Sequence, residues 1–343
     1  MSANERAGGR GGPGHGLEEA PVPMSSAAPV ASPPGGTAGK GPAAASGTSP
    51  PGRRRRARRR RQARVGLLFA APMLLLFVVF RFGPVLGAVL LSLTDYRLSG
   101  EWTFIGFENY TRLGGDDLFW DSLRVTLLYV VIFVPLTVLM SLATAAMLHQ
   151  VVWRRGLFRG IFFLPYVTSI VLAAVIWKWI YDAEDGLVNG LLGLASLGPV
   201  DFLGRGELVL PSIALTSAWK GFGYSMLILL AGLQAIPRSY TEAAMIDGAG
   251  PWQRFRHVTL PLLRPVLFFV MVIETITAFQ VFDAMYVMTG GGPVRSSFSL
   301  VYMLYDSGFK FFDFGYASAI GLVIFVFVLG VSLVQRRFLG RED

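Results

Sequence analysis

Long apolar runs alternate with shorter polar segments along most of the chain. Six of these runs are long enough to cross about 30 Å of hydrocarbon as an α-helix, and each contains few charged residues. This pattern predicts an all-α, polytopic membrane protein with six transmembrane helices. The predicted helices occupy residues 65–91, 122–148, 160–181, 208–234, 262–288 and 316–334.

The composition agrees with this interpretation. Of the 343 residues, 53% are hydrophobic and only 15% are charged, and apolar surface on that scale needs a bilayer to cover it. The chain has no cysteine, which excludes disulfides and thiolate metal sites. No pattern in the sequence indicates a metal site or a cofactor, and we expect neither.

A long polar tail, residues 1–64, precedes the first apolar run. Residues 1–52 are rich in Gly, Pro, Ala and Ser and have almost no large apolar side chains, so we expect them to be disordered. The run RRRRARRRRQAR at 53–64 is typical of a positive-inside anchor that meets anionic lipid headgroups of the bilayer. Nucleic-acid binding is the alternative, but no aromatic residues interleave with the arginines, and we expect no nucleic-acid partner. A cleaved signal peptide would need a small-residue cleavage site.

The charges in the loops predict the orientation. If the N terminus is cytosolic, segments 149–159, 235–261 and 335–343 lie inside, and these segments are rich in arginine. The opposite loops are acidic or mixed. Because cytosolic loops carry an excess of Lys and Arg, this bias predicts that both termini are cytosolic.

A polar stretch between the fourth and fifth runs, residues 237–261, has its own pattern. Ser239 and Glu242 have capping-box spacing and predict the start of a short helix, which Gly248 and the Gly250-Pro251 pair would end. A second short helix should follow, with Trp252, Phe255 and Val258 on one face. We interpret this helix-turn-helix as a docking element for a cytosolic partner; a solvated loop is the alternative.

The same stretch resembles a known family. Glu242-Ala243-Ala244, then Gly248, then Val258-Thr-Leu260-Pro261 match the EAA motif of bacterial ABC importer permeases, with Val258 where Ile is usual. More narrowly, residues 65–338 resemble the carbohydrate-uptake permeases of the maltose and glycerol-phosphate type. Further similar stretches are Thr94-Asp-Tyr96, Gly106-Phe-Glu-Asn109-Tyr110, Gly156-Leu-Phe-Arg159, Phe163-Leu-Pro165 and Thr289-Gly-Gly-Gly-Pro293.

This resemblance implies a permease subunit in the bacterial plasma membrane that moves a sugar or oligosaccharide. It implies three partners: a sister permease, a cytosolic ATPase dimer and an extracytoplasmic solute-binding protein. The chain would be no enzyme, since it lacks a phosphate loop and the ATPase subunits would hydrolyse ATP. The expected domains are a disordered, Arg-rich cytosolic tail at 1–64, a transporter domain at 65–338 that includes the EAA loop at 237–261, and a short cytosolic tail at 339–343. The residues expected to couple to the ATPase are Glu242, Ala243, Ala244, Gly248, Leu260 and Pro261.

Two alternatives to a sugar permease remain open. One is an ABC permease for a polyol or a glycerol phosphodiester. The other is a secondary transporter driven by an ion gradient, which would need paired intramembrane carboxylates.

Polar residues inside the predicted spans are candidates for function because they are costly in hydrocarbon. Glu274, Thr277 and Gln280 follow one face of the fifth run and would either line a substrate cavity or bond neighbouring helices together. The stretch 217–224 in the fourth run combines a lysine with aromatic residues and glycines, as suits a sugar. We interpret Trp219 as a packing or interface residue. By resemblance, the substrate-pathway positions are Ser217, Lys220, Gly221, Tyr224, Glu274 and Thr277.

Overall fold

The computed structural model describes residues 51–98, 100, 102–150 and 155–339. The chain divides into two units, Met1–Leu67 and Leu68–Asp343. In the first unit the described residues belong to helix α1, so residues 51–64 of the tail are helical rather than disordered. The predicted disorder of residues 1–50 lies outside the described residues. The helices are α1 (Pro51–Phe77), α2 (Gly83–Ser92), α3 (Glu108–Gly114), α4 (Asp117–Gln150), α5 (Arg155–Val167), α6 (Ile170–Ile180), α7 (Leu187–Leu194), α8 (Gly206–Ala235), α9 (Arg238–Ile246), α10 (Pro251–Arg254), α11 (Leu260–Phe279), α12 (Asp283–Thr289), α13 (Leu300–Tyr305) and α14 (Phe314–Leu339), with π-helical turns η1 (Val78–Phe82), η2 (Phe255–Thr259) and η3 (Asp306–Lys310).

The prediction of an all-α membrane protein is confirmed. Five continuous helical segments are long and apolar enough to cross a bilayer, and a bent pair of helices makes up to six. Across the described part of the chain, the extended structure consists of two isolated bridges. The five continuous segments are Val65–Ser92, Asp117–Gln150, Gly206–Ala235, Pro251–Phe279 and Phe314–Arg337.

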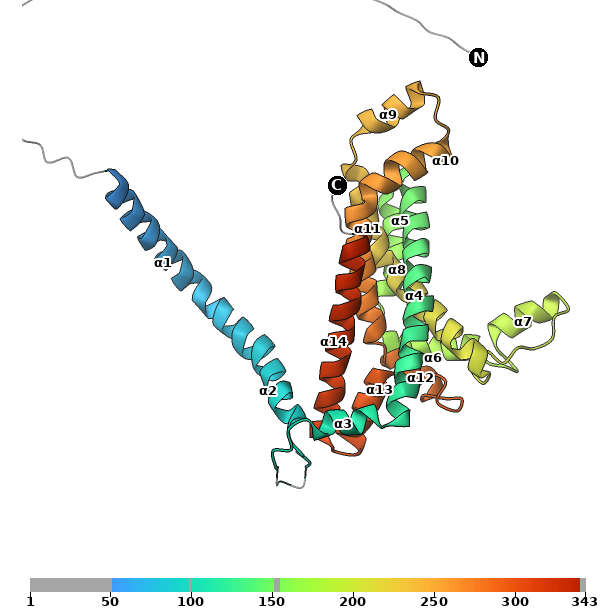
Figure 1. The fold of residues 1–343 in the computed structure, drawn as a ribbon. Coiled ribbons are helices and arrows are strands. Elements are labelled where there is room, and N and C mark those ends of the chain that lie inside the picture. Colours follow the sequence, from blue (N-terminus) through green and yellow to red (C-terminus); the bar gives the residue numbers. More distant parts are fainter. Residues whose placement is uncertain (1–50, 99, 101, 151–154, 340–343) are drawn as a thin grey trace, which may run out of the picture. The chain divides into compact units, whose positions relative to one another are not determined.

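Helices α4 and α8 form the centre of the second unit. They pack along each other, α11 packs against both, and α14 packs against α11 and α2. Large side chains such as Tyr129, Met226 and Leu229 are fully buried at these contacts. Figure 1 shows α9 and α10 at one end of this bundle and α3, α12 and α13 at the other. We call these the loop end and the far end.

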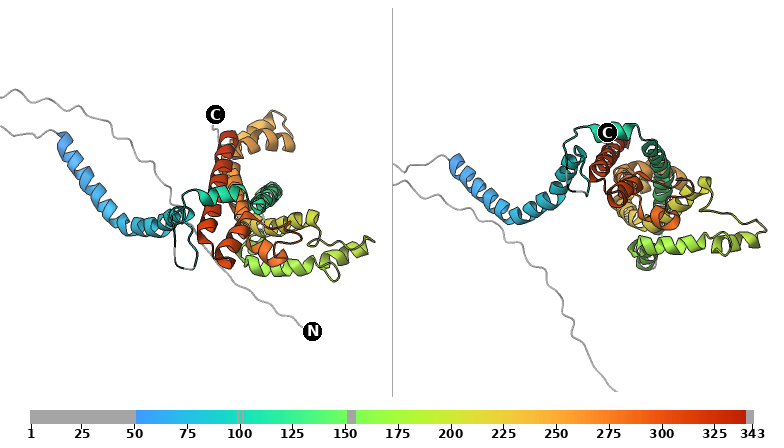
Figure 2. Two further views of the ribbon diagram at one scale, coloured as in Figure 1. Left: turned by 60° about the horizontal axis from the view of Figure 1, so that its bottom comes forward. Right: turned by 90° about the horizontal axis from the view of Figure 1, so that it is seen from below.

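The third predicted span is not one straight helix. The segment 160–181 is broken into α5 and α6, whose axes differ by 93°. Ser169, between them, has an extended backbone with φ −62° and ψ 134°. After α6 the chain continues into α7, which projects away from the bundle in the views of Figure 1 and Figure 2.

The fifth predicted span is also wrong at both ends. Its helix begins at Pro251, because α10, η2 and α11 follow one another without a break. The second short helix expected in the polar stretch is therefore the beginning of this span rather than a separate helix. At the other end α11 stops at Phe279 rather than at Met288. The chain then turns at 280–282 and starts the separate helix α12.

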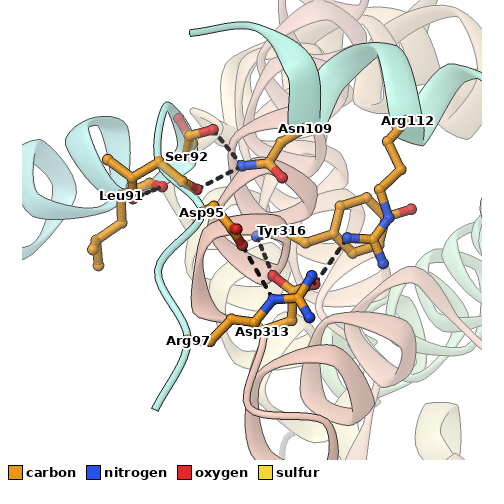
Figure 3. A network of polar contacts seen from close by, with 9 residues as sticks. Leu91, Ser92, Asp95, Arg97, Asn109, Arg112, Asp313 and Tyr316 are labelled. Atoms are coloured by element: carbon orange, nitrogen blue, oxygen red, sulfur yellow. Dashed lines mark hydrogen bonds and ion pairs between the residues drawn. The ribbon is translucent and has the colours of Figure 1, made fainter. Parts of the chain in front are cut away.

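A polar network at the far end ties α2 to α3 and α14 (Figure 3). The buried Asn109 side chain donates to the backbone oxygens of Ser92 at 2.9 Å and Thr94 at 3.0 Å. Asp313 accepts a hydrogen bond from Arg112 at 2.8 Å. Gly315 lies so close to this turn that a Cβ atom would be 2.1 Å from the Thr94 oxygen. The network gives a structural role to the stretches around Thr94 and Asn109 that carry the family resemblance.

We predict that Asn109→Ala loosens this end of the molecule. The substitution leaves two backbone oxygens without their donor, at a cost of about 1–3 kcal/mol for each buried group. The thermal unfolding midpoint of the purified protein should fall by several degrees. Thr111→Ala is the matched control, because that hydroxyl is exposed and bonds only locally to Glu108. Equal midpoints for the two variants would contradict the role of Asn109.

Candidate functional site

A cavity of about 290 Å³ lies among α4, α5, α6, α8, α11 and α12. All six residues predicted for the substrate pathway line this one cavity. They come from two helices that are far apart in the sequence, α8 and α11. The cavity wall contains Ser217, Lys220, Gly221 and Tyr224 from α8, and Glu274 and Thr277 from α11.

Glu274 is both a cavity residue and a partner of a neighbouring helix. Only 4% of its surface is exposed, and Ser225 on α8 donates a hydrogen bond to its carboxyl group. Thr277 and Gln280 also line the cavity, so the polar stripe predicted along this helix faces it. The two interpretations of Glu274 therefore hold together: it bonds α11 to α8, and it borders the space between them.

Aromatic residues complete the cavity wall. Tyr166 and Tyr224 stack with ring centres 5.0 Å apart and an angle of 14° between the rings. Tyr129 and Phe133 come from α4 and Phe282 from the turn after α11. We did not predict Tyr129, Phe133 or Tyr166, since each lies within an apolar run without a local signal. Only the packing of α4 and α5 against α8 brings them to the cavity.

Lys220 contacts the C-terminal end of α5. Its ammonium donates to the backbone oxygen of Tyr166 at 3.2 Å and lies 5.3 Å from the centre of the Tyr166 ring. Trp219, its neighbour, packs edge to face against Trp177 of α6, which agrees with the packing interpretation. Asp283, at the start of α12, also lines the cavity. The wall thus carries one ammonium and two carboxyl groups.

At the loop end, the polar stretch 237–261 forms a helix and a turn that lead into the fifth span. Helix α9 begins at Arg238 after Pro237, and no side chain caps it, so the predicted Ser239 capping box is wrong. Pro237 fixes the entry instead, because its φ of −60° and ψ of 134° stop the preceding helix and aim the chain into α9. Ser239 lies in the first turn of α9.

The predicted turn is present. Gly248 has φ +79°, a conformation that costs little for glycine and is strained for most other residues. The side chain of Gln253 then accepts a hydrogen bond from the Gly250 amide at 2.9 Å at the start of α10. Trp252 and Phe255 stack on one face of the following helix, as predicted.

The tip of this stretch exposes apolar side chains. Ile246 is 87% exposed and Trp252 68% exposed, and Tyr240 and Met245 are each about half exposed. Of the predicted coupling residues, Glu242, Ala243 and Gly248 are exposed. Ala244, Leu260 and Pro261 are half-buried and therefore face the bundle more than the surroundings. Isolated apolar groups at a protein surface are ordinary, but a cluster at the tip of a projecting loop indicates contact with a partner.

One helix joins this tip to the cavity. The helical path from Pro251 to Phe279 is continuous, so Trp252 stands near one end and Glu274 near the other. At 1.5 Å per residue the distance along the axis from Pro251 to Glu274 is about 35 Å. A displacement at the tip can therefore reach the cavity wall through a single element of secondary structure.

Comparisons with known proteins agree with these features. Residues 137–341 match the family model described as the binding-protein-dependent transport system inner membrane component. The chain is 36% identical over 274 residues to the trehalose/maltose transport system permease protein of Thermococcus litoralis, covering 80% of this chain and 92% of that protein. It is 34% identical over 275 residues to the sn-glycerol-3-phosphate transport system permease protein of Pectobacterium atrosepticum, covering 79% and 92%.

A solved structure gives the same fold. A chain in the crystal structure of a bacterial alginate ABC transporter, in complex with an alginate pentasaccharide-bound periplasmic protein, superimposes with a TM-score of 0.68. The two chains are 24% identical, and the match covers 80% of this chain and 94% of the other.

Proposed function

This chain belongs to the family of binding-protein-dependent transport system inner membrane components, and we propose that it carries a sugar or oligosaccharide into a bacterial cell. The pathway would be shared with a sister permease, and the energy would come from a separate ATPase dimer. An extracytoplasmic binding protein would deliver the substrate to the far end. The relative named for trehalose/maltose transport supports this choice of substrate, and the relative named for sn-glycerol-3-phosphate transport supports the alternative of a phosphate ester.

The observation that carries the proposal is the continuous helix between the exposed tip and the cavity. In this mechanism, closure of the ATPase dimer displaces α9, which sits on the tip. The displacement passes through η2 and α11 to Glu274 and Thr277. Movement of these side chains relative to α8 changes the shape of the cavity, which alternates between the two sides of the membrane.

The orientation of the chain in the membrane follows from the same proposal. The loop end lies in the cytosol, with both termini, and the far end faces outward. Residues 65–338 form the transporter domain, while 1–64 and 339–343 are cytosolic tails that play no part in ATP hydrolysis. The arginine run at 53–64 meets the anionic lipid headgroups of the inner leaflet.

The charges of the cavity favour an uncharged substrate over the alternative of a glycerol phosphodiester. Lys220 contributes one ammonium to the cavity wall, whereas Glu274 and Asp283 contribute two carboxyl groups. A phosphate would be opposed by like charge when these groups are ionised. Hydroxyl groups can donate to the carboxyl groups, and the Tyr166–Tyr224 pair suits the apolar face of a sugar ring. A polyol shares the hydroxyl groups but lacks the ring.

The test is uptake into proteoliposomes that contain the whole complex, purified with its partners from native membranes. The panel contains radiolabelled maltose, lactose, trehalose, a linear polyol, a glycerol phosphodiester and glycerol 3-phosphate, each bound to the binding protein of the complex. We expect ATP-dependent uptake of at least one neutral sugar and none of the two phosphate esters. Uptake of a phosphate ester alone would overturn the sugar assignment. Uptake driven by an ion gradient without ATP would support the secondary-transporter alternative instead.

A further inference from the structure

The break between α5 and α6 lies beside the cavity. Tyr166, in the last turn of α5, and Ile170, the first residue of α6, both line it. A helix end leaves its last backbone oxygens without partners inside the helix. The amide and the hydroxyl of Thr168 both donate to the Pro165 oxygen, at 3.2 Å and 2.7 Å. These local bonds satisfy Pro165 but not the next oxygen, that of Tyr166.

Lys220 supplies the donor for that oxygen from another helix. Its ammonium is 3.2 Å from the Tyr166 oxygen, although the two residues are 54 positions apart in the chain. A positive charge at the C-terminal end of a helix is also favourable because that end carries partial negative charge. Lys220 therefore caps α5 at the point where the chain bends by 93°.

The body of α5 is held firmly against α8. A Cβ atom on Gly223 would lie 2.2 Å from the backbone oxygen of Phe162, so the two backbones touch there. Phe162 and Phe222 pack edge to face next to this contact. These two contacts anchor α5 on α8 beside the bend, so we expect a change at the bend to move α6 rather than α5.

Helix α6 starts at the bend, beside the cavity. It packs against α12, and α12 begins with Asp283 and Ala284, which line the cavity. A swing of α6 about residues 168 and 169 would therefore displace part of the cavity wall on the side from which substrate is proposed to enter.

We propose that Lys220 is a positioning residue that holds the bend between α5 and α6 while the cavity is empty and releases it when a sugar binds. The proposal rests on the sugar-import function proposed above. An ammonium has three donors and no acceptor, and it stands in the cavity wall. Sugar hydroxyl groups that accept from Lys220 and draw its ammonium into the cavity lengthen and weaken its bond to the Tyr166 oxygen. Loss of that cap frees α6, and with it α12, to change position.

Distances between spin labels on α5 and α6 test the proposal. The native chain has no cysteine, so within this chain labels attach only at cysteines introduced for Leu157 and Ile176, both of which are exposed; this chain is labelled before it is assembled with its partners. The whole complex is measured in lipid nanodiscs without sugar. We expect a single narrow distance distribution for the native Lys220 and a broad or shifted one for Lys220→Met. Lys220→Arg should stay close to the native distribution, because a guanidinium also donates to a carbonyl oxygen.

The matched control is Lys178→Met. Lys178 is an exposed lysine on α6 that does not line the cavity, so its loss should leave the distances unchanged. Addition of the sugar with the highest uptake in the panel should shift the native distribution towards that of Lys220→Met. The stimulation of ATP hydrolysis by the sugar-loaded binding protein should fall at least about fivefold in Lys220→Met, the low end of coupling between sites.

Unchanged distances in Lys220→Met would overturn the capping role. If the distance distribution of the protein with native Lys220 does not change when sugar is added, the proposed link between the Lys220 contact and occupancy of the cavity is wrong. If no sugar is transported at all, the sugar-import function fails, yet the sugar-free distances still decide whether Lys220 holds the bend.

Discussion

Uptake is expected to be abolished by Gly248→Asp, while the protein remains in the membrane at its normal level. Gly248 has φ +79°, and among the described residues a Cβ atom there would meet no other atom within 4 Å. The chain itself therefore leaves room for a side chain, and the added bulk and charge point towards a partner. A misplaced charge in a docking contact costs several kcal/mol, and a loss of about 3 kcal/mol lowers the affinity roughly 100-fold.

Two further substitutions separate the effect of the added charge from the effect of backbone strain. Gly248→Asn has nearly the shape of aspartate without its charge, and asparagine tolerates the left-handed backbone conformation. Gly248→Ala adds little bulk but strains the backbone by about 1–2 kcal/mol. If charge at the docking contact is decisive, asparagine should retain most of the activity, and alanine should be intermediate. The measurements are ATP-dependent uptake and the amount of ATPase that copurifies with the permease. Normal uptake by Gly248→Asp would refute the coupling role of this turn.

Glu274→Leu is expected to have the second-largest effect. This substitution removes the acceptor for Ser225 and replaces a polar part of the cavity wall with an apolar side chain. A hydrogen bond to a charged group is worth about 1.5–3 kcal/mol, which corresponds to a loss of roughly 10-fold to 100-fold in apparent affinity. Sugar uptake should fall by that factor at low sugar concentration.

Ser225→Ala is the informative companion to this variant. It removes the bond between α8 and α11 but leaves the Glu274 carboxyl group in the cavity wall. If Glu274 binds substrate, Ser225→Ala should keep most of its uptake, and Glu274→Gln, which retains hydrogen-bonding capacity, should lie between the native protein and Glu274→Leu. If Glu274 serves only to join the helices, Ser225→Ala and Glu274→Leu should be equally damaging. Concentration dependence of uptake distinguishes these outcomes, because a substrate contact changes the half-saturating concentration most.

The coupling loop and the cavity differ in how much a local pattern could predict. Gly248 and the Gly250-Pro251 pair are conformational signals that act within a few residues, so the turn was predictable. The capping box was not formed, because Pro237 already defines the start of α9. Ile246 was missed as the most exposed apolar residue of the tip, since an apolar side chain in a helical pattern gives no sign of whether it faces the bundle or a partner.

The cavity, in contrast, depends on contacts between residues that are far apart in the sequence. Resemblance supplied its α8 and α11 residues, and all six line the one cavity in the structure. Tyr129 and Tyr166 joined them only through the packing of α4 and α5 against α8. The contact of Lys220 with the Tyr166 oxygen links residues 54 positions apart, beyond the reach of any periodicity.

By itself, the sequence determined that this is an all-α membrane protein and where most of its apolar helices lie, because burying backbone polar groups in hydrocarbon requires long, continuous helices. It also determined the family, through the spaced motif around Gly248. Tertiary structure decided where two of the spans are interrupted. Hydropathy is the same for a straight helix and for a bent pair, and the bend after Val167 depends on donors for the freed backbone oxygens. Thr168 supplies one nearby, and Lys220 supplies the other from a different helix.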